Sequence, residues 1–223
     1  MMDDFSLRQA VIDACRAMNA LGINQGTSGN ISVRQGAGML ISPSAIPYDR
    51  LEPEMIAAMP LDAEDGRWAG PHRPSTEWPF HHAILRARPE VRAIVHTHAP
   101  YATTLAITRR GIPACHYMVA AFGGDNIRCA PYALFGTGEL ARLALAALED
   151  RMGCLLANHG MIALGESLDQ ALWRAVELES LARQYYQALL LGEVCLLSDA
   201  EIAASRAQFA GYGLRDRSGS RGA

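Results

Sequence analysis

The sequence predicts a mixed α/β protein in which helices cover a central sheet. Two observations predict this class. Helix-type periodicity and short apolar β-type runs alternate along the chain, and 50% of the 223 residues are hydrophobic while only 19% are charged. Such a composition supplies enough apolar surface for a large core. The length is that of one large domain, so we expect residues 1–214 to form a single domain and residues 215–223 to form a frayed tail.

The first half of the chain begins with a helix signal. Ser6 and Gln9 have the spacing of a capping box, and apolar residues then recur at helical intervals, which predicts a helix over residues 6–21. The other elements expected in this half are a hairpin of strands 31–34 and 39–42, a surface loop over 62–74, a helix over 76–87 and a strand over 93–98.

The second half repeats this alternation. Thr137 is a helix cap and predicts a helix to about residue 150, and Ser167 with Gln170 opens a long amphipathic helix that ends at Gly192. The remaining expected elements are strands 154–157 and 161–164, and a final helix opened by Ser198 and Glu201.

The basic residues exclude several classes of function. The chain has 20 basic and 23 acidic residues and a net charge of -3, which does not favour nucleic-acid or anionic-membrane binding. Every basic residue is Arg, and the sequence contains no Lys. Lysine aldolases and pyridoxal-phosphate enzymes need a Lys amine, and the P-loop needs a Lys for its phosphates. All three classes are therefore excluded.

The five cysteines form no CxxC motif and no close pair, so we expect reduced thiols in the core. The first residues, Met1 to Asp4, lack the basic and apolar regions of a signal peptide, and no apolar run approaches the length of a membrane span. We therefore expect a cytoplasmic protein.

Three histidines and one glutamate form a candidate metal site. His96 and His98 are two residues apart on an expected strand, so both imidazoles should point to the same face. A catalytic metal needs a third ligand, and His159, in a polar interruption between two apolar runs, is the natural choice. An isolated HxH pair is more often solvated or part of a core, but Glu77 at a helix start adds a carboxylate to the set.

Three donor-rich turns indicate that the substrate carries an anion. The segment 24–30 contains two glycines with Ser, Thr and Asn side chains, a composition that can present several N–H and O–H groups to one phosphate. Segments 42–45 and 75–76 offer similar donors, the second at a helix start. Each segment alone is more simply a polar turn, but together with the metal site they suggest a phosphorylated substrate.

In these motifs the sequence resembles the class II aldolase/adducin family. The resemblance covers nearly the whole chain, from the first helix through segments 24–34, 39–51, 74–81, 95–98, 112–132, 135–137, 155–163 and 212–214. It implies a three-layer fold with a largely antiparallel central sheet, and a cyclic homotetramer with active sites at the subunit borders. It also implies one divalent metal per subunit, zinc first, with cobalt or manganese as alternatives.

The resemblance also implies roles for individual residues. The metal ligands would be His96, His98 and His159, with Glu77 as an exchangeable fourth ligand that also serves as acid/base. Tyr117 from a neighbouring subunit would be a proton donor near the aldehyde, and Tyr212 would help close the site. The phosphate pocket would consist of Gly29, Asn30, Ser44, Ala45, Ser75 and Thr76.

Two positions depart from the family pattern. Ala45 stands where the pattern has Gly, which adds a methyl group near the phosphate. Thr97 replaces an amide residue between the two strand histidines, where strand alternation should turn it away from the metal. Neither departure removes a ligand.

The expected activity is cleavage of a ketose 1-phosphate to dihydroxyacetone phosphate and a small aldehyde, of the fuculose 1-phosphate to L-lactaldehyde type. Aldol cleavage leaves negative charge on the three-carbon fragment, and without Lys a metal Lewis acid is the remaining electron sink. Alternatives are cleavage of 5-deoxyribulose or methylthioribulose 1-phosphate in a salvage pathway, or epimerase, dehydratase or decarboxylase chemistry on the same scaffold. A non-catalytic, adducin-like assembly module is the alternative from another class, and it predicts lost histidines.

Overall fold

Seven strands form one sheet: β1 (Asn30–Gln35), β2 (Gly38–Ile41), β3 (Ala57–Pro60), β4 (Ala93–Thr97), β5 (Cys129–Ala130), β6 (Gly153–Leu156) and β7 (Gly160–Gly165). The computed structural model describes residues 3–63 and 65–209. Across the sheet the order is β3-β2-β1-β4-β7-β6-β5. Neighbouring strands pair antiparallel except β5 with β6, which pair parallel. The sheet is thus largely antiparallel, with β4 at its centre.

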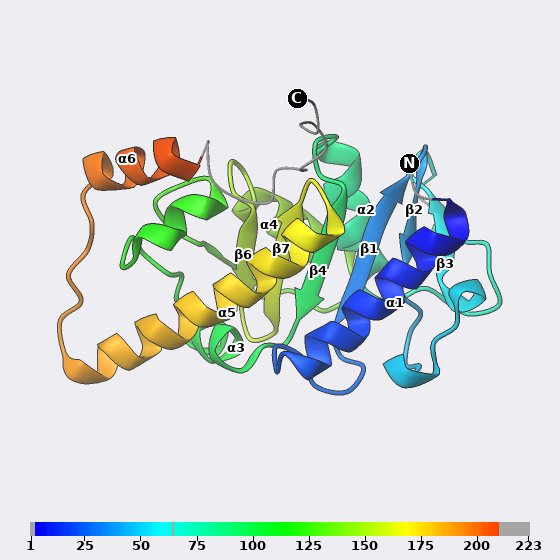
Figure 1. Cartoon of the computed structure of the whole chain (residues 1–223), viewed down its shortest axis with the longest axis horizontal. Coiled ribbons are helices and arrows are strands. Elements are labelled where there is room, and N and C mark those ends of the chain that lie inside the picture. Colours follow the sequence, from blue (N-terminus) through cyan, green and yellow to red (C-terminus); the bar gives the residue numbers. More distant parts are fainter. Residues whose placement is uncertain (1–2, 64, 210–223) are drawn as a thin grey trace, which may run out of the picture.

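Helices cover both faces of this sheet (Figure 1). They are α1 (Asp4–Ala20), α2 (Trp78–Ala87), α3 (Pro100–Ile107), α4 (Gly138–Ala147), α5 (Leu168–Leu191) and α6 (Asp199–Phe209), with 3-10 helices η1 (Tyr48–Arg50), η2 (Pro53–Met55) and η3 (Tyr117–Phe122). In Figure 1, α1 and α5 cross the near face, whereas α2 and α4 lie behind the sheet. The predicted fold class is confirmed. Within the described residues, no helix has the length and apolar character needed to cross a bilayer.

Strand alternation divides the buried side chains that flank the sheet into two large clusters. On β4, Ala93 and Val95 pack with residues of α1, α3 and α5, while Ile94 packs with residues of α2 and α4. Both clusters consist of side chains that are almost fully buried. Complete burial of one large aliphatic side chain contributes about 1.5–3 kcal/mol. The two layers therefore hold the central strands firmly in place.

Arginine side chains fix the helix ends against the sheet. Arg34 on β1 donates to the carbonyls of Arg88 (3.2 Å) and Val91 (3.1 Å), just after α2. Arg88 in turn donates to the carbonyls of Leu148 (2.8 Å) and Arg151 (3.0 Å), just after α4. A guanidinium can satisfy several carbonyls at once, so these contacts cap the exposed C=O groups at the helix C-termini. The hydrogen bonds from Arg34 thus help to hold the end of α2 over β1.

Two helices begin where local signals placed them, whereas the first helix begins earlier. Thr137 and Ser167 accept hydrogen bonds from the backbone N–H groups of Leu140 and Gln170 and cap α4 and α5. The predicted cap at Ser6 is wrong. The cap of α1 is Asp3, whose carboxylate accepts the Ser6 N–H at 2.8 Å, and the helix begins two residues earlier than expected.

Two other boundaries near the candidate site differ from expectation. Helix α2 begins at Trp78 with Glu77 as its N-cap residue, so Glu77 precedes the helix instead of lying in its first turn. Strand β4 ends at Thr97, so His98 follows the strand. The elements β3, α3, η3 and β5 were not predicted. The expected loop is present over residues 62–63 and 65–74, apart from isolated bridges at Ala69 and Pro74.

Candidate metal site and substrate pocket

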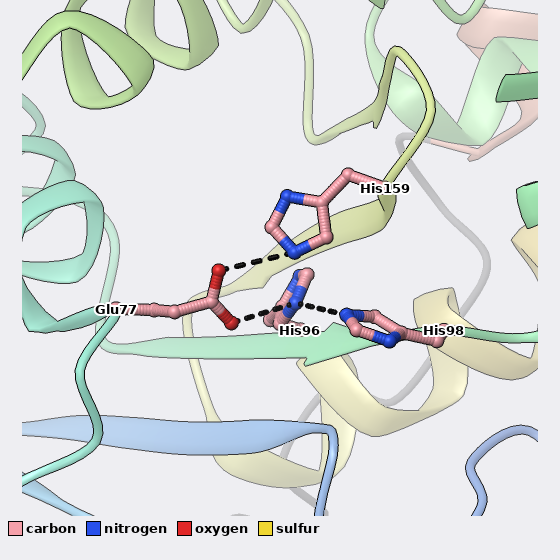
Figure 2. A group of neighbouring side chains, drawn as sticks. All are labelled: Glu77, His96, His98 and His159. Carbon is pink, nitrogen blue, oxygen red and sulfur yellow. Dashed lines mark hydrogen bonds and ion pairs between the residues drawn. The ribbon is translucent and has the colours of Figure 1, made fainter. Parts of the chain in front are cut away.

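Four side chains from separate elements converge at one end of the sheet (Figure 2). His96 lies on β4, His98 directly after it, His159 in the turn between β6 and β7, and Glu77 at the start of α2. One ligand atom from each residue lies within 4.8 Å of all the others. These are the four residues that the sequence selected as metal ligands, and the structure places them together.

The spacing of their polar atoms fits a tetrahedral metal. Glu77 Oε2 is 3.0 Å from His96 Nε2, and Glu77 Oε1 is 3.1 Å from His159 Nε2. His96 Nε2 and His98 Nε2 are 3.2 Å apart. Zinc bonds of 2.0–2.1 Å at tetrahedral angles separate neighbouring ligand atoms by about 3.3 Å. These three pairs lie close to that spacing, and one ligand atom from each residue lies within 4.8 Å of the others, so the residues present fit a divalent cation.

The hydrogen bond on the far side of His96 supports this fit. His96 Nδ1 lies 2.8 Å from the carbonyl oxygen of Met161, which can only accept a hydrogen bond. The Nδ1–H of His96 is therefore committed to this carbonyl, which leaves Nε2 as the ring atom that would bind a cation. Second contacts of this kind orient metal-binding histidines and fix their tautomer.

The electrostatics of the cluster keep Glu77 ionised. Burial by itself would raise the pKa of Glu77, but the neighbouring charges and hydrogen bonds of His96 and His159 outweigh it and hold the pKa well below its usual value. Burial, together with His96 and His159, lowers the pKa of His98 to about 4. A charged carboxylate beside a neutral imidazole is the state that a divalent metal requires.

Close packing of the backbone brings the histidines together. His96 pairs with Asn30 of β1 on one side and with Ile162 of β7 on the other. At the start of β7, a Cβ on Gly160 would lie 2.5 Å from the Thr97 carbonyl oxygen and 2.9 Å from the His98 ring. Only glycine allows this approach. The absence of a side chain at residue 160 therefore brings the turn that carries His159 next to the end of β4.

The three donor-rich segments also lie side by side. The Ile31 N–H donates to Ser42 Oγ at 3.1 Å, which joins the first segment to the second. The Ser75 N–H donates to the Ser42 carbonyl at 3.0 Å, and Pro43 bridges Pro74, which joins the second segment to the third. The third segment leads directly into Glu77. The three segments predicted to hold the phosphate are thus neighbours in the fold, next to the histidine cluster.

The residues predicted to bind the phosphate differ in their exposure to solvent. Thr76 and Ala45 are exposed, Ser44 is partly exposed, and Gly29 and Ser75 are buried. The Tyr48 hydroxyl donates to the Gly29 carbonyl and holds the first segment in place. Ala45 has a φ of 59°, in the left-handed region that favours glycine. The departure from the family pattern at this position therefore strains the backbone as well as adding a methyl group.

The side chain of Asn30 is occupied within the protein. It is only 3% exposed, and its Nδ2 donates to Glu77 Oε2 at 3.0 Å. Its Oδ1 lies 2.5 Å from His81 Nε2. Thr97 lies two residues after Val95 on β4, so both side chains point to the same face of the sheet. Val95 packs on the α5 side, and Thr97 therefore points away from Glu77.

Tyr117 lies outside the cluster in this chain. It is on η3, is 53% exposed, and its ring stacks on Phe209 of α6 with centroids 6.2 Å apart. Tyr212 and the tail 215–223 lie outside the described residues.

Comparison with known proteins identifies the family. The model of the class II aldolase and adducin N-terminal domain matches residues 9–186. The chain belongs to this family. A 5-methylthioribulose-1-phosphate/5-deoxyribulose-1-phosphate aldolase of Rhodospirillum rubrum is 51% identical over 93% of each chain. An L-fuculose phosphate aldolase of Escherichia coli is 46% identical over 96% of this chain and 99% of the relative.

A solved structure supports the assignment to the class II aldolase family. An L-fuculose 1-phosphate aldolase superposes with a TM-score of 0.88 at 35% identity, over 92% of this chain and 96% of the other. Both the full-length relatives and this structure carry aldolase names. The predicted enzyme class, a class II aldolase, is confirmed, and the two predicted kinds of ketose phosphate both occur among the relatives' names.

Sequence reasoning missed two polar residues that support the site. His81 on α2 and Ser32 on β1 are both fully buried, and they extend the hydrogen bonds of Asn30 away from Glu77. A signal was present: Glu77 and His81 are four residues apart at a helix start, and Asn30 and Ser32 alternate on a strand. Without the packing of α2 on β1, nothing in the sequence connects the two pairs.

Proposed function

We propose that this protein is a metal-dependent class II aldolase that cleaves a ketose 1-phosphate reversibly to dihydroxyacetone phosphate and a small aldehyde. The observation that carries the proposal is the convergence of His96, His98, His159 and Glu77 beside a surface of three donor-rich segments. A chain without Lys needs another way to stabilise the charge that aldol cleavage creates. The non-catalytic, adducin-like alternative predicts lost histidines, and all of them are retained.

The metal ligands in this proposal are the three histidines, with Glu77 as the exchangeable fourth. A divalent cation held there supplies a Lewis acid for the negative charge that develops as the C3–C4 bond of the ketose breaks. Zinc fits the spacing of the ligand atoms, and cobalt or manganese are the alternatives because imidazole binds several divalent ions. Glu77 moves a proton at C3, and Tyr117 of a neighbouring subunit moves the proton of the C4 hydroxyl.

The phosphate is held by Gly29, Asn30, Ser44, Ala45, Ser75 and Thr76. The continuity of their three segments supports this assignment. Asn30 has already committed one N–H and its oxygen within the protein, so only its second N–H is left for a phosphate oxygen. Binding the phosphate fixes the position of the ketose, with its reactive carbons near Glu77.

The proposed enzyme is a homotetramer whose active sites lie at subunit borders. Tyr117 supports this arrangement because it is exposed and lies apart from the histidines of its own chain. In this proposal residues 1–214 belong to one domain and Tyr212 contributes to closing the site. A cytoplasmic location is consistent with the five cysteines, all of which are free thiols.

A panel assay tests the proposal and identifies the aldehyde. Purified zinc-loaded protein is given fuculose 1-phosphate, 5-deoxyribulose 1-phosphate or methylthioribulose 1-phosphate, and dihydroxyacetone phosphate is measured with a coupled reductase. The last two substrates are the second candidate, favoured by the 51% identity to the Rhodospirillum rubrum relative. We expect cleavage of at least one substrate at a rate that chelation abolishes. Absence of dihydroxyacetone phosphate with all three, or epimerised, dehydrated or decarboxylated product instead, overturns the proposal.

A further inference from the structure

A line of buried polar side chains extends from Glu77 into the interface between α2 and β1. Beyond Glu77 it consists of Asn30, His81 and Ser32, which are 3%, 0% and 0% exposed. Three hydrogen bonds connect the line: Glu77 to Asn30 at 3.0 Å, Asn30 to His81 at 2.5 Å and His81 to Ser32 at 2.7 Å. His81 and Ser32 lie outside the metal-ligand set and outside the phosphate segments.

Each hydrogen bond in this line has only one workable direction. The ionised Glu77 can only accept, so Asn30 must present its Nδ2 to Oε2. The Oδ1 of Asn30 then faces His81 and needs a donor, which is the Nε2–H of His81. A neutral ring protonated on Nε2 has a lone pair on Nδ1, so the Ser32 hydroxyl donates to it. The donors therefore all point towards the carboxylate.

His81 holds the end of the Asn30 amide that faces away from Glu77. The two ends of an amide are almost identical in shape, so the hydrogen-bond partners alone set its orientation. Without the Nε2–H of His81, the amide oxygen becomes a buried acceptor with no partner, which is unfavourable. The amide can then shift, and its hydrogen bond to Oε2 of Glu77 weakens. The orientation of Glu77 thus depends on a ring that does not touch it.

We propose that His81 and Ser32 are positioning residues for Glu77. Ser32 donates to Nδ1 of His81, the Nε2–H of His81 donates to the Asn30 oxygen, and Asn30 anchors Oε2 of Glu77 while Oε1 remains beside His159. The role assigned to Glu77 rests on the proposed function, whereas the direction of the hydrogen bonds is independent of it. In ligand clusters of this kind, the groups that orient a ligand are worth about 10- to 100-fold in metal affinity or activity.

The tautomer can be read in the intact protein without any activity measurement. Protein labelled with ¹⁵N-histidine is examined by long-range ¹H–¹⁵N correlation, and the His81 signals are assigned by their loss in His81→Phe. We expect a neutral His81 ring protonated on Nε2 in the zinc-loaded wild type. A ring protonated on Nδ1, or a doubly protonated ring at neutral pH, overturns the proposal whether or not the protein is an aldolase.

Substitutions at His81 test the positioning role. His81→Phe keeps a ring without a donor, and His81→Gln places an amide N–H near the original Nε2. His82→Gln is the matched control, since His82 is the next residue of α2 and its ring meets Trp78 at a centroid distance of 5.7 Å. Steady-state kinetics are measured on the substrate found active in the panel assay, with zinc content and melting temperature measured for every variant.

We expect His81→Phe to lower kcat by about 10- to 100-fold with KM within about twofold and with zinc still bound. His81→Gln should recover most of kcat, and Ser32→Ala should fall between the two. His82→Gln should behave like wild type in kcat. The proposal is overturned if His81→Phe has the same kcat as the control. It is also overturned if His81→Phe and His81→Gln lose equal activity in proportion to their melting temperatures, because the line would then only pack α2 against the sheet. Failure of the wild type to cleave any ketose phosphate refutes the proposed function instead and leaves the tautomer result standing.

Discussion

Replacing Gly160 with alanine tests how the site is assembled. The added methyl group would lie 2.5 Å from the Thr97 carbonyl oxygen and 2.9 Å from the His98 ring. The carbonyl belongs to the backbone of β4, which pairs with β7 at this point through Thr97 and Met161, so it cannot move without disturbing the central pairing. Overpacking of this kind costs about 1–3 kcal/mol. We expect Gly160→Ala to lower the free energy of unfolding by that amount and to reduce bound metal, because His98 must move.

Urea denaturation of metal-free protein, followed by circular dichroism, measures the loss of stability, and elemental analysis of the purified protein measures the metal. Gly138→Ala is the matched control. A Cβ at Gly138 meets no atom within 4 Å at the start of α4, so this variant should be as stable as wild type or more stable by up to about 1 kcal/mol. If Gly160→Ala matches this control in both stability and metal content, the close approach does not determine the site.

Three further predictions follow from the same geometry. Ala45→Gly should raise the free energy of unfolding by about 1 kcal/mol in urea titrations, because glycine adopts the φ of 59° without steric cost; an unchanged or lower value contradicts this. In metal-free protein the pKa values of His81 and His98 are lowered to about 3 and about 4, so below the ordinary value of about 6.5 the unfolded chain binds protons that the folded chain does not. The two histidines therefore contribute fully to the free energy of unfolding above that pH, and this contribution is lost as the pH falls towards 4. Urea titrations that show equal stability from pH 7 to pH 4 would refute this prediction. A ketose without its phosphate should lose kcat as well as affinity, because the phosphate contacts position the reactive carbons; a loss confined to KM in steady-state assays contradicts this.

The elements found from the sequence are those that local chemistry determines. Thr137 and Ser167 cap their helices through side chains within three residues, and a local pattern can reveal that. Helix α3 depends on a distant residue instead. The carboxylate of Glu179, on α5, accepts the backbone N–H groups of Tyr101 and Ala102 at the start of α3. A contact across nearly eighty residues leaves no local signal, and this explains why α3 was missed.

The same distinction applies to the candidate site. His96 and His98 were found because two histidines at alternate positions are a local pattern, and Glu77 because it lies at a helix start. The contribution of His159 could be inferred only from the need for a third ligand and from the resemblance. His81 and Ser32 were missed because each looks like an ordinary core or strand residue until α2 packs on β1. Sequence therefore indicated the ligands, whereas tertiary packing was needed to show what orients them.

Metal dependence is the central claim, and titration of stripped protein tests it most directly. The protein is treated with a chelator until elemental analysis detects no divalent metal, and zinc is then returned stepwise while dihydroxyacetone phosphate formation is followed. We predict no cleavage by the stripped protein and full recovery at one zinc per chain, with no recovery in His96→Ala. Cleavage at the full rate by stripped wild-type protein would contradict the account.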